Sequence, residues 1–278
     1  MTNLIVDKNG SLLNELGVEN SEQGSQIKNL LKQLELNSGG KKYPLISIVI
    51  PLYNEEKTIR KVLESLPNDP SIEIIVVDDN STDNSILEIR KIIHNKNIRI
   101  LQHDKNKGYG SALLTGISHA RGEILVTMDS DGQHRADDLY NLIKPIVNGE
   151  ADITIGSRYI GSYHYDLPFS TRFGEALLEV VIKLLFKQRI KNNQGGFRAF
   201  HKKTFKIFES IKFRGYAFTT ELILAASLYG FKIKECPIKL LDREYGSSYI
   251  RLHKLTFSIF LCIILYFLKK IKRILFKK

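Results

Sequence analysis

Apolar and β-branched residues recur in short blocks along the chain from Leu45 onward. Short apolar blocks bounded by polar residues are typical of buried strands, whereas apolar residues spaced three and four apart predict amphipathic helices. The blocks predict strands at 45–50, 73–77, 98–101, 123–128, 152–155 and 231–241. The helical spacings predict helices at 54–66, 83–93, 111–120, 137–147, 171–186, 204–210 and 220–229. This alternation predicts an α/β fold with a mostly parallel, doubly wound sheet.

A few residues mark where these elements are expected to begin and end. Pro51 is expected to stop the first strand, and Asn54, Glu55 and Glu56 to start the following helix with acids at its positive end. The stretch 159–170 is rich in Tyr, Ser and Gly and predicts a loop. Loops of that length in a compact domain are usually functional or mobile.

The two ends of the chain differ from its central part. Residues 25–36 have apolar side chains at helical spacing, and 38–42 indicate a flexible linker. The apolar face of this short helix suits either its own domain or a partner. The pattern therefore divides the chain into an N-terminal appendage at 1–44, a main domain at 45–250 and a C-terminal helix at 251–278.

The C-terminal helix carries both apolar surface and much of the positive charge. An uncharged run of fourteen residues, 255–268, precedes a tail in which six of the last ten residues are basic, and the whole chain has a net charge of +11. Because a helix needs about twenty apolar residues to cross a bilayer, this run predicts an interfacial membrane helix and a peripheral or monotopic protein. Basic residues beside apolar ones favour a membrane surface over nucleic acid. The alternative is a buried dimer helix, which would make the protein a homo-oligomer.

The N-terminus and the cysteines indicate the cellular compartment. Residues 1–7 lack the basic and apolar regions of a signal peptide, and Cys236 and Cys262 have no metal-binding spacing. We therefore expect reduced thiols and a location on the cytoplasmic face of a membrane.

Acidic and polar residues follow three of the predicted strands, at Asn54 and Glu55, at Asp78 and Asp79, and at Asp129 and Asp131. The carboxyl ends of parallel strands form the ligand-binding edge of such a sheet. Carboxylates at Asp129 and Asp131 suit a divalent cation that holds a diphosphate. Solvated turns and helix caps are the alternatives, and Asp83 is expected to be a cap.

Several motifs are absent from the chain. It has no Gly-x-x-x-x-Gly-Lys-Ser/Thr loop, no His-Glu-x-x-His, no Cys-x-x-Cys and no Gly-x-Ser-x-Gly. Kinases, zinc hydrolases and serine hydrolases are therefore disfavoured.

Eight short motifs in order resemble those of the family-two glycosyltransferases. The most specific of them reads Met128-Asp129-Ser130-Asp131-Gly132-Gln133-His134, similar to the Asp-x-Asp element of the GT-A (nucleotide-diphospho-sugar transferase) fold. Three more lie at 49–56, 76–83 and 106–112. Four others, at 156–159, 195–198, 215–221 and 242–248, resemble the dolichol-phosphate mannosyltransferase and polyprenyl-phosphate glucosyltransferase group.

The resemblance implies site residues of four kinds. The donor nucleotide sugar would contact Pro51, Tyr53, Glu55, Asp79, Asp129, Ser130 and Asp131. Mg²⁺ or Mn²⁺ would be held by Asp129, Asp131 and Gln133. The acceptor phosphate would face Arg158, Arg172, Arg243 and Ser248, with Arg198 also available. The groups that act in the chemical step would be Asp129, Asp131, Arg158 and Arg243.

The implied activity is transfer of a hexose, from GDP-mannose or UDP-glucose, to a polyprenyl or dolichyl phosphate that feeds lipid-linked glycans or protein glycosylation. The chain has Asn192 where an aspartate is expected, and Tyr249 where many relatives have lysine. Neither need abolish activity, because a phosphate monoester is largely a dianion at neutral pH and attacks without a general base. Direct displacement would invert the anomeric configuration. A saccharide or protein acceptor, with a base such as Glu221, and a non-catalytic membrane-binding protein are the alternatives.

Overall fold

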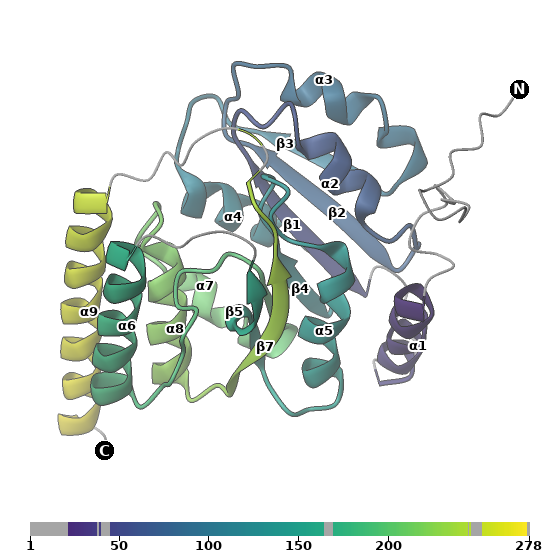
Figure 1. Ribbon diagram of the computed structural model, residues 1–278. Coiled ribbons are helices and arrows are strands. Elements are labelled where there is room, and N and C mark those ends of the chain that lie inside the picture. Colours follow the sequence, from purple (N-terminus) through teal and green to yellow (C-terminus); the bar gives the residue numbers. More distant parts are fainter. Residues whose placement is uncertain are drawn as a thin grey trace, which may run out of the picture.

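The computed structural model describes residues 22–37, 39, 45–163, 169–243, 245 and 252–276. In these parts of the chain seven strands form one sheet, in the order β3-β2-β1-β4-β6-β5-β7 (Figure 1). Their bounds are β1 Ile46–Leu52, β2 Ile72–Asp78, β3 Ile98–Gln102, β4 Ile124–Thr127, β5 Ile153–Tyr163, β6 Arg198–His201 and β7 Ile233–Leu240. The strand β6 is antiparallel to β4 and β5, and the other pairs are parallel. The predicted mostly parallel sheet is confirmed.

Helices cover both faces of this sheet, as a doubly wound fold requires. On one face lie α1 Glu22–Asn37, α2 Ile59–Ser65, α3 Ser85–Arg90 and α5 Leu139–Val147. On the other lie α4 Tyr109–Ser118, α6 Phe169–Phe186, α7 Lys206–Glu209, α8 Phe218–Tyr229 and α9 Leu252–Leu275. Alternate residues of the central strands enter the two cores, with Ile48 and Ile50 in one and Val49 in the other. This burial on both faces explains why β1 and β2 are apolar almost throughout.

The prediction that Pro51 ends the first strand was wrong, because β1 continues to Leu52. The Val49 carbonyl accepts from the Met128 N–H toward β4, and the Leu52 carbonyl accepts from the Asp79 N–H toward β2. Since successive residues face opposite sides, the nitrogen of Pro51 faces β4, which has already ended at Thr127. No ladder hydrogen bond is lost there, so proline is tolerated.

Two further boundaries differ from the prediction. The helix expected from residue 54 begins only at Ile59, because Asn54 has a φ of +54° and forms part of a turn. The stretch expected to be a loop, 159–170, is partly regular. β5 continues through a bulge to Tyr163 beside β7, α6 starts at Phe169, and 164–168 lie outside the described residues.

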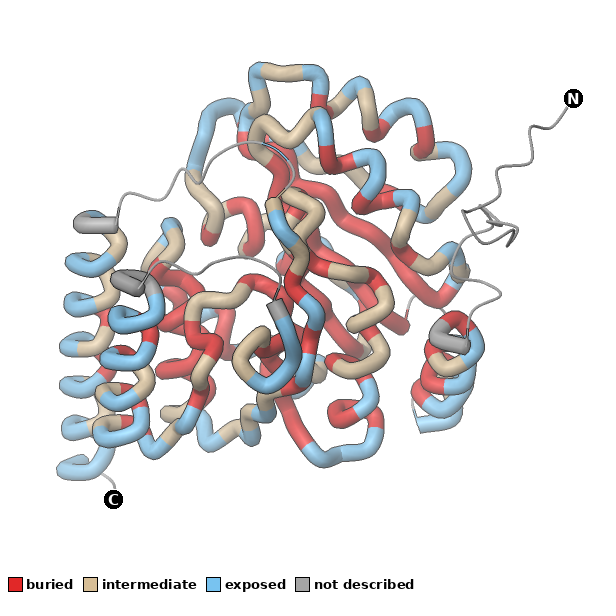
Figure 2. Tube along the Cα trace, in the orientation of Figure 1, coloured by how far each residue is buried: buried red, intermediate tan, exposed pale blue. Residues whose placement is uncertain are grey.

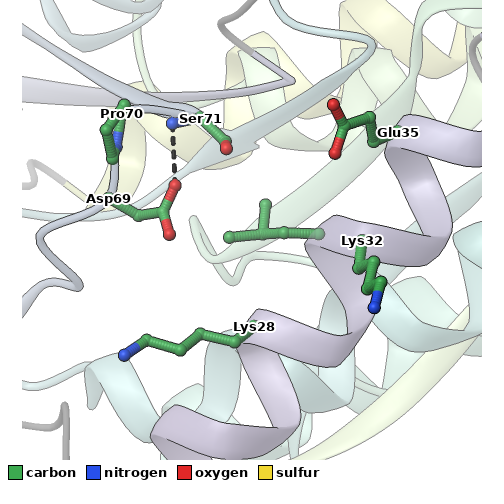
Figure 3. Close-up of a pocket in the computed structure, with 7 residues that line it drawn as sticks. Lys28, Lys32, Glu35, Asp69, Pro70 and Ser71 are labelled. Atoms are coloured by element: carbon green, nitrogen blue, oxygen red, sulfur yellow. Dashed lines mark hydrogen bonds between the residues drawn. The ribbon is translucent and has the colours of Figure 1, made fainter. Parts of the chain in front are cut away.

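The N-terminal helix α1 confirms the helix predicted at 25–36 and packs on its own domain. Its residues Ile27, Leu30, Leu31 and Leu34 are buried against the core that α5 also covers. A cavity of about 280 Å³ lies between α1 and the loop before β2. Figure 3 shows the residues that line it, with Lys28 and Lys32 on α1. This cavity lies at the amino ends of the strands, away from the acidic strand ends. The division of the chain at 44 and 250 stays a prediction.

The C-terminal helix α9 is partly a core helix. It packs on α8 and buries Cys262 and Tyr266, while its outer face is exposed beside α6 (Figures 1 and 2). The basic tail also binds the domain: Lys270 donates to the Leu185 carbonyl at the end of α6, and Arg273 to the Leu228 carbonyl of α8. Cations at these carboxyl ends are favoured by the helix dipoles. None of the helices that the structure describes is both long and apolar enough to cross a membrane.

Candidate active site

The acidic strand ends converge on one large cleft of about 1560 Å³. The predicted site residues that line it are Pro51, Tyr53, Glu55, Asp79, Asp129, Ser130, Asp131, Gln133, Arg158 and Arg243. The parallel register explains their meeting, because Leu52 at the end of β1 lies opposite Asp78 at the end of β2. Arg172 is not in the lining, and Ser248 and Tyr249 lie outside the described residues.

A tight turn after β4 presents the two central carboxylates. Gly132 has a φ of +81°, in the region that favours glycine, and the Gln133 N–H donates to Asp131 Oδ1 at 3.1 Å. The Thr58 hydroxyl donates to the Ser130 carbonyl at 2.8 Å and ties the turn to the start of α2. Burial raises the pKa of Asp129, His134 opposes this rise, and the nearby Asp131 adds to it.

These carboxylates fit a divalent cation that also binds substrate. Two neighbouring carboxylates repel each other unless a cation lies between them. Among the described residues, no group of three His, Cys, Asp or Glu side chains forms a complete metal site. Mg²⁺ typically takes one or two carboxylates and fills its other positions with water and phosphate oxygens, so Asp129 and Asp131 match this donor set.

Gln133 links the carboxylate turn to the segment that follows β7. Its Nε2 donates to the Leu241 carbonyl at 3.0 Å, and the Leu241 N–H donates to the Gln133 carbonyl at 2.9 Å. The side-chain amide keeps Oε1 as a candidate metal ligand. This double contact also brings Arg243 over the site, where its guanidinium pairs with the Glu55 carboxylate.

Asp79 is buried on the floor of the cleft, where it holds a neighbouring loop. Its carboxylate accepts from the backbone N–H groups of Lys107 and Gly108 at 2.8 and 2.7 Å, and pairs with the His103 ring at 2.6 Å. Gly108 has a φ of +92°, and a Cβ there would lie 3.2 Å from the Arg214 carbonyl oxygen. A nucleoside over Asp79 would therefore meet this loop as well as the carboxylate.

Tyr109 is a site residue to which the sequence assigned no role, although it lies within the motif at 106–112. Its hydroxyl donates to Asp129 Oδ1 at 2.9 Å, and its ring stacks on Tyr216 with centroids 5.3 Å apart. A Cβ on Gly196 would lie 2.4 Å from that hydroxyl and 2.6 Å from Asp129 Oδ1. Only glycine at 196 lets the tyrosine and the carboxylate meet.

We expect Tyr109→Phe to weaken metal-dependent binding of a nucleoside diphosphate by about 10-fold, the usual size for losing a partner of a metal ligand. Thermal stabilisation by UDP or GDP, each with and without Mn²⁺, measures this. Tyr216→Phe is the control, because it keeps the stacked rings and the Asp129 contact. Equal behaviour of the two variants would contradict a role for the hydroxyl.

Two arginines and a glutamate form a second charged cluster, at the other side of the cleft. Arg158 at the bend of β5 donates to both carboxylate oxygens of Glu175 on α6, at 2.8 and 3.0 Å. The Tyr159 hydroxyl donates to the same carboxylate, and the Arg172 guanidinium lies 4.0 Å from the Tyr159 ring centroid. The structure thus brings Arg158 and Arg172 to the same tyrosine ring, whereas Arg243 pairs with Glu55.

Arg198 and Glu221 serve the scaffold and do not line the cleft. Arg198 donates to the carbonyls of Gly195, Thr219 and Asn193, and burial lowers its pKa to about 10. Glu221 is fully buried and accepts from the N–H groups of Lys212 and Phe213 and from the Tyr266 hydroxyl. Glu221 is therefore not placed to deprotonate an acceptor in the cleft.

The position expected to be an aspartate, Asn192, lies in the cleft wall. Its amide donates to the Gly156 carbonyl at 2.6 Å. A carboxylate has no proton for that contact, so the asparagine suits this backbone arrangement better than the ionised acid would.

A mostly parallel sheet with paired acids at its carboxyl edge is the arrangement that the sequence motifs imply for a nucleotide-sugar transferase. Residues 47–208 match the family described as Glycosyl transferase family 2, and the chain belongs to this family. The GT-A fold expected from the motifs is confirmed by solved structures. A glucosyl-3-phosphoglycerate synthase from Mycobacterium tuberculosis superposes with a TM-score of 0.65 and 21% identity, covering 85% of this chain and 82% of its own.

Two relatives extend the comparison. The chain is 32% identical to a UDP-N-acetylglucosamine–dolichyl-phosphate N-acetylglucosaminyltransferase from Methanococcus voltae, over 73% of this chain and 88% of that protein. It is 30% identical to a dolichol-phosphate mannosyltransferase from Pyrococcus furiosus, over 74% of this chain and 59% of that protein. These similarities bear out the resemblance to the dolichol-phosphate group.

Proposed function

We propose that this glycosyltransferase moves one hexose from a nucleotide sugar to a polyprenyl or dolichyl phosphate, with inversion at the anomeric carbon. The observation that carries the proposal is the composition of the cleft at the acidic strand ends. It runs from the acidic strand ends, past Arg158, into an apolar groove between α6 and α9. The names of both relatives contain a dolichyl phosphate acceptor, which supports the same substrate class.

The apolar part of the cleft suits the chain of a lipid. On α6 it is lined by Leu177, Leu178, Val181 and Leu185. On α9 it is lined by Leu255, Ile259, Phe260, Ile263, Ile264 and Phe267. A saccharide acceptor is polar and would not be stabilised by such a groove. A polyprenyl chain would be stabilised there, because its apolar surface leaves water. The cationic residues at the groove's mouth would receive the phosphate, so one molecule satisfies both surfaces.

In the proposed reaction the acceptor phosphate oxygen attacks the anomeric carbon while the bond to the donor diphosphate breaks. The oxygen needs no base, since the phosphate monoester is already largely a dianion. Arg158 and Arg243, which line the cleft, would hold it in line with the sugar and offset its charge. Asp129, Asp131 and Gln133 would hold Mg²⁺ or Mn²⁺, which would neutralise charge on the leaving diphosphate. A solved protein of this fold contains Mn²⁺ with UDP, in keeping with that assignment.

Purified protein supplied with labelled nucleotide sugars and polyprenyl phosphate in detergent tests this function. The sugars to compare are mannose and glucose, together with the N-acetylglucosamine named for the first relative. We expect label in the lipid fraction for one of them, in a β-linked product. Transfer only to a saccharide or protein acceptor would overturn the proposal.

We further propose that the outer faces of α6 and α9 bind the cytoplasmic surface of a membrane. Both helices have an exposed face (Figure 2). Its large apolar residues include Phe173, Val180 and Leu184 on α6 and Phe257, Leu268 and Ile274 on α9. Lys254 and Lys272 lie at the two ends of α9 and are exposed. Apolar side chains flanked by cations match an anionic lipid interface, where the acceptor's phosphate group also lies.

Replacing Phe257 and Leu268 together by serine should weaken binding to anionic vesicles by more than 10-fold. Each side chain is mostly exposed, at 62% and 57%, and inserting one into lipid is worth about 1.5–3 kcal/mol. Co-sedimentation with vesicles of phosphatidylglycerol and phosphatidylcholine measures the change. Leu87→Ser is the matched control, since Leu87 is 53% exposed on α3, far from α9 in Figure 1. Equal vesicle binding by the wild type, the double variant and Leu87→Ser would contradict the proposed membrane contact.

A further inference from the structure

Glu175 is an acid at the place where the proposed function needs positive charge. It lies on α6 between the arginine cluster and the apolar groove and is 7% exposed. The carboxylate holds Arg158, whose side chain is 12% exposed, and accepts from the Tyr159 hydroxyl. An arginine withdrawn this far from water needs a counter-charge, and Glu175 supplies it.

The same carboxylate conflicts with a bound phosphate. A lipid phosphate that reached Arg158 would place up to two negative charges beside a third, inside a partly desolvated site where repulsion is strong. Either Glu175 stays and weakens acceptor binding, or it leaves Arg158 when the phosphate arrives.

The surroundings of Glu175 allow its side chain to move away from Arg158. Its backbone is held, because the Asn193 side-chain amide donates to the Glu175 carbonyl at 3.1 Å, so only the side chain has to move. Glu175 itself lines the cleft, so its side chain borders the open volume into which it would move.

We propose that Glu175 is a displaceable counter-ion, which occupies Arg158 until the phosphate of the acceptor replaces it. Binding is then an exchange of anions on one guanidinium. A phosphate dianion carries more charge and more acceptor oxygens than a carboxylate, so it binds Arg158 more strongly than Glu175 does. A singly charged phosphate diester has little advantage over the carboxylate. Glu175 thus selects for a terminal phosphate monoester. This inference rests on the proposed lipid-phosphate acceptor.

Glu175→Gln tests the exchange through the sign of its effect. The amide keeps the shape of the side chain and can still accept from Tyr159, but it no longer competes for Arg158. We expect the KM for polyprenyl phosphate to fall by about 10-fold, equivalent to one pKa unit of charge interaction. The methyl ester of the same lipid phosphate, used as an inhibitor, should gain even more, so the preference for monoester over diester shrinks.

A purely structural Glu175 gives the opposite result. If the carboxylate only positions Arg158, Glu175→Gln raises the KM and leaves the monoester preference intact, which overturns the inference. Glu179→Gln is the matched control, one turn further along α6, where Glu179 pairs with Arg189 at the surface. We expect it to match the wild type.

Two further measurements keep the test decisive. Should Glu175→Gln lower the melting temperature, Tyr159→Phe removes a hydrogen bond that retains the carboxylate without changing charge, and it should also lower the KM. An unchanged or raised KM in that variant contradicts the exchange. If the wild-type protein itself transfers no sugar to lipid phosphate, the proposed function fails, and inorganic phosphate binding to wild type and Glu175→Gln still reports on the counter-ion.

Discussion

Asp131→Asn should lower kcat/KM for sugar transfer by about 1000-fold, because it removes one of the two anionic ligands proposed for a divalent cation that would stabilise the leaving diphosphate. Asparagine has nearly the same shape, and its amide oxygen can still accept from the Gln133 N–H, which lies 3.1 Å from Asp131 Oδ1. The turn after β4 should therefore survive. Only the charge at the cation site changes.

Two readouts separate the chemistry from the fold. The variant should keep the melting temperature of the ligand-free protein but lose the extra stabilisation that a nucleoside diphosphate with Mn²⁺ confers by mass action. Asp137→Asn is the control, since Asp137 lies in the same connection but pairs with Arg135 outside the cleft. If Asp131→Asn kept the wild-type rate of sugar transfer, Asp131 would not be a ligand of the proposed cation.

Arg243→Ala should lower kcat/KM by about 100-fold, the usual cost of losing a charged donor to a reacting group, which is the role proposed for Arg243 toward the acceptor phosphate. Its guanidinium reaches across the cleft to Glu55, and Leu241 and Gln133 hold the segment that carries it. Arg60→Ala is the control, because Arg60 forms a solvent-exposed pair with Glu64 on α2. Equal loss in both variants would mean that the effect is not specific to the cleft.

The same variant makes a pH-dependent prediction about stability. Burial raises the pKa of Glu55 above its ordinary value of 4.5, Arg243 opposes this rise, and Asp131 adds to it. Removing Arg243 therefore raises the pKa of Glu55 further. A group with a raised folded pKa contributes stability at low pH and loses it as the pH rises through that pKa. The melting temperature of Arg243→Ala should fall furthest below wild type near pH 8 and approach it near pH 5. A difference in melting temperature that is the same at every pH would show that Arg243 does not affect the pKa of Glu55.

The periodicity of the sequence predicted most of the fold because local chemistry specifies it. Short apolar runs such as 74–77 are typical of strands buried on both faces, and the helical spacings place one face of each helix on a core. The strand β6 was missed because its four residues, Arg198–His201, contain no alternation or apolar run. Its conformation comes from pairing with β4 and β5, which are distant in sequence.

The positions of the acids followed from the sequence for a similar reason. A residue directly after a parallel strand must lie at the carboxyl edge of the sheet, so Asp79, Asp129 and Asp131 were placed together before any contact was known. The partners of these acids were not predictable. Tyr109 reaches Asp129 from α4, and Gly196 reaches it from the loop before β6, at sequence separations that carry no periodic signal.

By itself, the sequence determined the fold class, the acidic edge of the cleft and the family, because strand burial and strand ends depend on neighbouring residues. The tertiary structure alone decided which side chains meet across elements. It paired Arg158 with Glu175 and Arg243 with Glu55, removed Glu221 from the cleft, and joined α6 and α9 into one apolar groove. These arrangements depend on the packing of helices against a twisted sheet, where distances of a few ångströms decide whether an arginine faces a carboxylate or a ligand.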